Sequence, residues 1–216
     1  MELKIDLASK PYPTCPYCNE TLEKMPSRKI KCRSCGKEMY VRSTQKVFES
    51  SLLTREDAMA ADQLKQLETY GVTSTDFLDK RTELSQKFGG KAKSADAIWA
   101  IFNDLIAKNS QDLDALRMIY YSTALFLNSE GKDYSELLRQ SAKMRLLSYK
   151  KEGFVEKVGI STGGEGLCSA CSKLDGKKLS IDEALEKMPL PFNGCTNSIE
   201  NGKQGFCMCD WMPVVD

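Results

Sequence analysis

Cys15-Pro16-Tyr17-Cys18 and Cys32-Arg33-Ser34-Cys35-Gly36 form two C-x₂-C motifs, separated by 13 residues, near the start of the sequence. A C-x₂-C turn presents two thiolates on one side of the chain, so two such turns supply the four soft ligands of a tetrahedral metal ion. Proline after the first cysteine and glycine after the last are residues that favour turns. The spacing predicts a Cys₄ zinc site formed by Cys15, Cys18, Cys32 and Cys35.

This stretch resembles the zinc-ribbon family. The resemblance implies a small unit of short strands held by one structural zinc ion. We expect Thr21 to Met25 and Arg28 to Lys31 to form a β-hairpin that brings the two motifs together. A unit of about 35 residues buries too little apolar surface to fold without a bound metal, which is the structural interpretation of this site.

A second interpretation of the ribbon is a contact surface for nucleic acid. Between Lys24 and Lys46, eight Lys and Arg side chains are accompanied by one acidic residue, Glu38. Such a density of positive charge attracts phosphate, and Tyr17 and Tyr40 offer rings on which bases can stack. The residues assigned to this contact are Arg28, Lys29, Lys31 and Arg33.

The remaining five cysteines lie in the last 49 residues, and none occurs between Cys35 and Cys168. Cys168-x₂-Cys171 is a half-site like those of the ribbon, and Cys195 adds a third thiol. Cys207 and Cys209 would face opposite ways on a strand, so we expect one of them to be the fourth ligand, without deciding which. The sequence predicts a second zinc site here, with buried free thiols or a redox pair as the alternative.

The tail also resembles the C-terminal module of phage Mu F-type head-morphogenesis proteins. The resemblance rests, over about 50 residues, on Cys168-x₂-Cys171-x₂-Leu174-Asp175-Gly176-Lys177, Pro189-Leu190-Pro191 and Cys207-x-Cys209-x₃-Pro213-Val214. The family's histidine is absent, with Cys195 as its substitute, and Met208 stands where the family has arginine. A metal-stabilised, β-rich module is what the resemblance implies.

The segment between the two cysteine groups has the apolar periodicity of helices. We expect five helices, at Thr54 to Tyr70, from Ser74 to before Gly89, from Ser94, from Ser110 to about Asn128, and at Asp133 to Glu152. The short turn between the last two predicts an antiparallel helical hairpin. Trp99, Tyr120 and Tyr121 lie on helical faces and are assigned to the core. Beyond Gly153 we expect a β-like segment at Phe154 to Ile160, a short helix at Ile181 to Met188 and a closing strand at Phe206 to Val215.

The predicted fold class is therefore α+β and mostly helical. Three domains are expected: a zinc ribbon at 1–50, a helical domain at 51–153 and a cysteine-rich α+β module at 154–216. No apolar stretch approaches the ~20 residues of a membrane helix, and the first residues lack the apolar core of a signal peptide. We expect a cytoplasmic protein without membrane contact, in which thiols stay reduced and bind metal.

Composition narrows the chemistry further. The chain has no histidine, which excludes Ser-His-Asp and Cys-His nucleophile systems and all histidine-bound zinc enzymes. With 31 Lys and Arg against 30 Asp and Glu, the net charge of +1 favours no class of partner. Near the tail cysteines, Asp175, Asp182 and Glu183 occupy a turn and a helix start, where carboxylates have structural roles.

These patterns favour a non-enzymatic, zinc-binding adaptor that contacts a protein or nucleic-acid partner. Two alternatives stay open at this point. One is a phage- or prophage-derived structural protein of the head-morphogenesis type, and the other is a zinc-dependent enzyme that uses the C-terminal cluster. The partner and the oligomeric state are not determined by the sequence.

Overall fold

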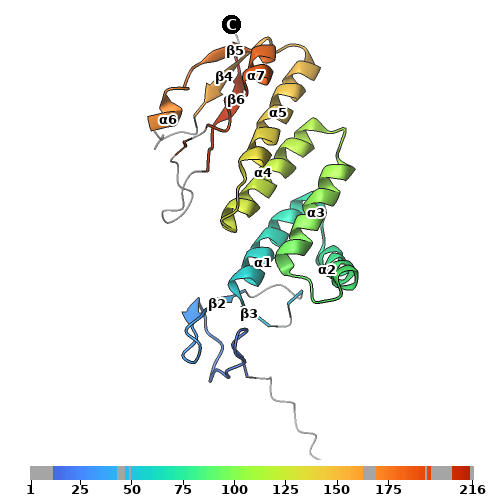
Figure 1. Cartoon of the computed structure of the whole chain (residues 1–216), viewed down its shortest axis with the longest axis vertical. Helices are drawn as coiled ribbons and strands as arrows, with labels where there is room; N and C mark the ends of the chain where they lie inside the picture. The colour runs from blue at the N-terminus through green and yellow to red at the C-terminus, as the bar shows by residue number, and fades with distance from the viewer. Residues whose placement is uncertain are drawn as a thin grey trace, which may run out of the picture. The chain divides into compact units, whose positions relative to one another are not determined.

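The protein, seen in a computed structural model, is described over residues 12–42, 47–48, 50–162, 169–192, 194–195 and 206–214. Its fold is α+β, with about half of these residues in helices and two small antiparallel sheets (Figure 1). The chain divides into two compact units, Met1–Ile101 and Phe102–Asp216. The expected fold class is confirmed at this level, whereas the three-domain division stays a prediction.

The first sheet has the order β1-β2-β3, formed by β1 (Ile30–Lys31), β2 (Glu38–Val41) and β3 (Leu52–Leu53). The expected hairpin between Thr21 to Met25 and Arg28 to Lys31 is wrong. Thr21 forms an isolated bridge with Thr14, and Ile30–Lys31 pairs with β2 instead. The physical reason is that each C-x₂-C turn closes its own antiparallel pair, so the strands flank the motifs rather than join them.

Local capping signals place the helices of the first unit. In α1 (Arg55–Leu67), Thr54 accepts a hydrogen bond from the Asp57 N–H, and a 3₁₀ turn, η1 (Glu68–Tyr70), ends at Gly71. In α2 (Ser74–Phe88), Thr73 and Asp76 form a complete capping box. The next helix, α3 (Ser94–Lys108), contains the boundary between the two units. Trp99 on α3 is 38% exposed, so its assignment to the core is wrong.

The second unit is built on the predicted helical hairpin, α4 (Leu113–Ser129) and α5 (Ser135–Glu152), which lie side by side in Figure 1. The second sheet has the order β5-β4-β6, formed by β4 (Lys157–Ser161), β5 (Lys178–Ser180) and β6 (Asp210–Pro213). Two short helices, α6 (Ser169–Ser172) and α7 (Ile181–Lys187), belong to the same unit. Its core centres on Trp211, which is fully buried among residues of α5, β4 and α7.

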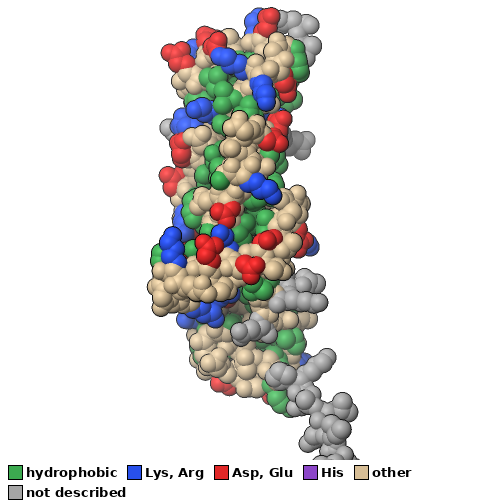
Figure 2. All heavy atoms as spheres, turned by 90° about the vertical axis from the view of Figure 1, so that its right-hand side faces the viewer, with side chains coloured by type: hydrophobic (Ala, Val, Ile, Leu, Met, Phe, Trp, Pro, Cys, Tyr) green, Lys and Arg blue, Asp and Glu red, His purple; other side chains and the backbone are tan. Residues whose placement is uncertain are grey.

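None of the helices in the described ranges is both long and apolar enough to span a bilayer. On the face shown in Figure 2, acidic and basic side chains are interspersed.

Candidate metal centres

The first cysteine cluster is assembled by two turns of the same backbone geometry. In each turn the first cysteine accepts a hydrogen bond at its carbonyl from the N–H four residues on, and donates its own N–H to the carbonyl five residues on. Asn19 and Gly36 occupy equivalent positions, and both have left-handed backbones, with φ of 60° and 71°. The sequence reveals the glycine, while Asn19 is the residue type that most readily replaces it there.

This repetition brings the four predicted thiols together. The Sγ atoms of Cys15, Cys18, Cys32 and Cys35 all lie within 4.8 Å of one another. Across the two turns, Cys15 Sγ is 3.8 Å from Cys35 Sγ, and Cys18 Sγ is 3.7 Å from Cys32 Sγ. Four sulfurs bound at 2.3 Å around a tetrahedral zinc ion are themselves about 3.8 Å apart. The thiols therefore have the spacing that a single such ion requires.

Crowding of the thiols separates their acidities. Backbone N–H groups of Cys35 and Ser34 lower the pKa of Cys32 to about 7, against the opposing effect of desolvation. For Cys18, the backbone N–H of Glu20 lowers the pKa, but desolvation and the three neighbouring thiols outweigh it and raise the pKa to about 12. A metal cation that binds this cluster displaces the protons of the four thiols, because its ligands are thiolates.

In the second unit, Cys171, Cys195 and Cys207 form a buried group whose sulfurs also lie within 4.8 Å of one another. Cys171 Sγ donates to Cys195 Sγ at 3.6 Å. They come from α6, the loop after α7 and the segment before β6. Three distant parts of the sequence therefore meet at one point. Cys168, the other predicted ligand, lies outside the described residues.

Cys209 also faces this group. Hydrogen bonding to Cys207, desolvation and the nearby Cys171 thiol raise its pKa, while the hydrogen bond from Cys209 lowers the pKa of Cys207 to about 5. Residues 207–209 precede β6 and have no strand pleat, so the strand alternation expected there is absent, and which of Cys207 and Cys209 is the fourth ligand stays a prediction. The tail cluster thus comprises four described thiols, and it could hold a metal ion.

Both helices of the hairpin pack against the tail cluster. Ala124 of α4 and Leu138 of α5 pack against the cysteines together with Phe206. The ring of Phe206 lies between those of Tyr121 and Tyr134, at centroid distances of 5.6 and 5.0 Å. The rings of Tyr121 and Tyr134 are thus held in place by their contacts with Phe206.

Two arginines beside the cluster escaped the sequence reasoning. Arg117 Nη1 and Arg145 Nη2 lie 3.4 and 3.3 Å from the same atom, Asp210 Oδ2. The Nε atoms of both arginines are buried, and neither has a hydrogen-bond partner among the described residues. Asp210 directly follows Cys209, but its partners are far away in the sequence, so spacing could not reveal them.

The carboxylates near the tail cluster all have structural partners. Asp175 accepts a hydrogen bond from Thr162 at 2.7 Å, and Asp182 pairs with Lys150 at 2.6 Å. Glu183 completes the capping box of α7 with Ser180. These roles agree with the structural interpretation of the three residues.

Some residues of the predicted basic surface already interact with neighbouring side chains of the same unit. Arg28, Lys31 and Arg33 are exposed, whereas Lys29 pairs with Glu38 at 3.2 Å and holds the pKa of that carboxyl below its usual value. The ammonium of Lys29 lies over the Tyr40 ring, and that of Lys37 over the Tyr17 ring, at 5.6 and 5.0 Å. Each of the two rings thus already has a lysine over it.

Comparison with known proteins yields no match to a family model, a curated protein or a solved structure. The resemblances to zinc ribbons and to the phage head-morphogenesis module therefore rest on the sequence motifs alone.

Proposed function

We propose that the chain is a zinc-binding interaction protein with two structural centres, a zinc ribbon at Cys15, Cys18, Cys32 and Cys35 and a second site in the tail. The observation that supports this most strongly is the 3.7–3.8 Å separation of sulfurs across the two turns of the first cluster. All-thiolate tetrahedral sites bind zinc in structural roles, with no position open to a substrate. Thiolate ligands require reduced cysteines, which a cytoplasmic location maintains.

In this proposal the metal stabilises the fold that presents a binding surface, and it takes no part in catalysis. The first sheet has strands of only two to four residues, and its core consists of ligand cysteines and a few apolar side chains. Such a unit gains its folding free energy from the metal. The exposed groups around it, Arg28, Lys31 and Arg33 among them, are then available to a protein or nucleic-acid partner.

Metal analysis tests the proposal. We expect two zinc ions per chain, and X-ray absorption showing only sulfur ligands at about 2.3 Å. If the analysis finds iron instead of zinc, the metal in the proposal changes to iron, because four thiolates also hold iron–sulfur clusters. A nitrogen or oxygen ligand at the tail metal would instead favour the zinc-dependent enzyme.

Substitution of single tail cysteines makes the test of the second zinc site more specific. Cys168→Ser and Cys209→Ser are compared, each in the full chain. The variant that retains two zinc ions identifies the thiol that is not a ligand, and the one that retains a single ion identifies the fourth ligand. If both variants retain two ions, the four-thiolate tail site is wrong.

A further inference from the structure

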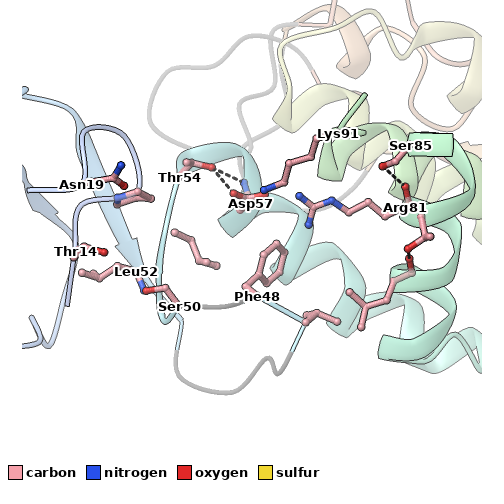
Figure 3. A pocket seen from close by; sticks show the side chains of 15 residues that line it. Thr14, Asn19, Phe48, Ser50, Leu52, Thr54, Asp57, Arg81, Ser85 and Lys91 are labelled. Carbon is pink, nitrogen blue, oxygen red and sulfur yellow. Dashed lines mark hydrogen bonds between the residues drawn. The ribbon is translucent and has the colours of Figure 1, made fainter. Parts of the chain in front are cut away.

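A polar cavity in the first unit adjoins the first C-x₂-C turn, and no cysteine lines it. Its volume is about 670 Å³, within the range of pockets that hold small organic ligands. One wall is the first C-x₂-C turn, with Thr14 and Asn19; the opposite wall is α2, with Arg81 and Ser85 (Figure 3). Phe48 and Ser50 line it between these walls.

The cavity has an excess of positive charge. Its charged lining residues are Arg81, Lys91 and Asp57. Both oxygens of Asp57 already accept hydrogen bonds, one from Thr54 and the other from Ser94. Among the described residues, neither Arg81 nor Lys91 forms an ion pair.

The two cations are held on the same wall by hydrogen bonds around Ala92. Arg81 Nε donates to the Ala92 carbonyl at 3.2 Å, and the Ala92 N–H donates to Ser85 Oγ at 2.9 Å. Ser85 Oγ in turn donates to the Arg81 carbonyl at 2.7 Å. The residue before Ala92, Lys91, is therefore fixed beside α2, and both cationic side chains reach toward the middle of the cavity in Figure 3.

An aromatic ring lies next to these charges. Phe48 is half-buried and packs on one side against Phe77, with 6.0 Å between the ring centroids. It also lines the cavity. Thr14, Asn19 and Ser50, which also line the cavity, offer hydroxyl and amide groups. Cations, a flat apolar ring and neutral polar groups within one cavity match the phosphate, the base face and the base edges of a nucleotide.

We propose that this cavity binds a nucleotide of single-stranded nucleic acid. Arg81 and Lys91 contact the phosphate, the base stacks on Phe48, and Thr14, Asn19 and Ser50 face its edges. The proposal goes beyond the metal-binding function and does not depend on the tail site. It also places the contact away from the basic surface of Arg28, Lys29, Lys31 and Arg33.

Fluorescence anisotropy of a labelled octathymidylate with the full zinc-loaded chain tests this at low salt. Lys91→Ala should weaken binding about threefold to tenfold and lower the salt slope by about one. The matched control is Lys93→Ala, an exposed lysine two residues away that does not line the cavity. An equal loss of affinity in the two variants would mean that the oligonucleotide is attracted by the general positive charge and not bound in the cavity, and it would overturn the proposal.

Phe48→Leu should weaken binding about tenfold, as expected for the loss of one stacked base. Because this variant could also disturb the packing on Phe77, ultraviolet cross-linking of the unaltered chain is a second measurement. The proposal expects the cross-linked peptide to contain Phe48. No binding at low salt, cross-links confined to other peptides, or a loss of binding only in Arg28→Ala and Arg33→Ala would each refute it. Equally tight binding of a labelled oligoglutamate would show an acidic-peptide site instead.

Discussion

Replacing Asp210 with asparagine isolates the role of one charge beside the tail cluster. Asp210 Oδ2 is the shared partner of Arg117 and Arg145, while its Oδ1 accepts the Trp211 N–H at 2.8 Å. Asparagine has the same shape and keeps a carbonyl oxygen for Trp211. Asp210→Asn therefore removes the negative charge and leaves the packing in place.

The expected loss follows from how deeply the three groups are buried. Removing one partner of a fully buried ion pair destabilises a protein by roughly 3–5 kcal/mol, whereas exposed pairs contribute at most about 1 kcal/mol. The arginine side chains are 22% and 25% exposed, and that of Asp210 is 40% exposed. The site lies between these limits, and two cations lose their partner at once. We expect Asp210→Asn to lower the free energy of unfolding by about 2 kcal/mol.

Urea unfolding of the zinc-saturated protein measures this loss. The chain has two tryptophans. In a Trp99→Phe background, the fluorescence reports the buried Trp211 of the second unit alone. The matched control is Asp182→Asn, because Asp182 pairs with Lys150 but is 79% exposed, and its change should stay below about 0.5 kcal/mol.

A compensating change tests the mechanism. Asp210→Asn combined with Arg117→Met removes one of the unpaired cations and should recover part of the lost stability. The reasoning fails if Asp210→Asn behaves like Asp182→Asn, or if the double variant is no more stable than the single one.

Three further predictions address other parts of the molecule. Cys15→Ser and Cys195→Ser should each reduce the zinc content from two ions to one; an unchanged count in either contradicts the corresponding site. Gly153→Ala should destabilise the protein by about 1 kcal/mol in urea unfolding, since φ there is +78° and a Cβ would meet nothing within 4 Å. An unchanged stability would show that the left-handed cap of α5 is unimportant. The Ser180 N–H, with Lys187, lowers the pKa of Glu183 below 4.5, so its stabilising effect is present above that pH and lost as the pH falls through the lowered pKa. The stability difference from Glu183→Gln should shrink on acidification, and a difference that grows would refute the sign.

The sequence predicted most accurately those features that depend on neighbouring residues. Gly71 and Gly153 end helices where expected, because each adopts the left-handed backbone that glycine tolerates best. The start of α4 was misplaced by a few residues, since the cap is Asp112, whose side chain accepts the Ala115 N–H, and not Ser110. Both residues are good caps, and only the tertiary structure selects between them.

Long-range contacts account for what the sequence did not reveal. The first cluster was predictable because its thiols lie in two repeated local turns. At the tail, the orientation of Cys209 depends on where β6 begins, and the partners of Asp210 come from α4 and α5. Neither depends on a short-range pattern. The cavity beside Phe48 was likewise invisible, as its walls come from a cysteine turn and a helix that no motif connects.

The two clusters differ in how much of the protein depends on them. Cys15, Cys18, Cys32 and Cys35 lie in adjacent turns, so a metal there stabilises chiefly the small sheet that surrounds it. The tail thiols come from α6, the loop after α7 and the segment before β6, and they pack on both helices of the hairpin. A metal at this point ties α6 and the segment between α7 and β6 to one another beside the hairpin. Loss of the tail metal should therefore loosen the whole second unit, including the attachment of β6, whereas loss of the first should leave Trp211 in its buried environment.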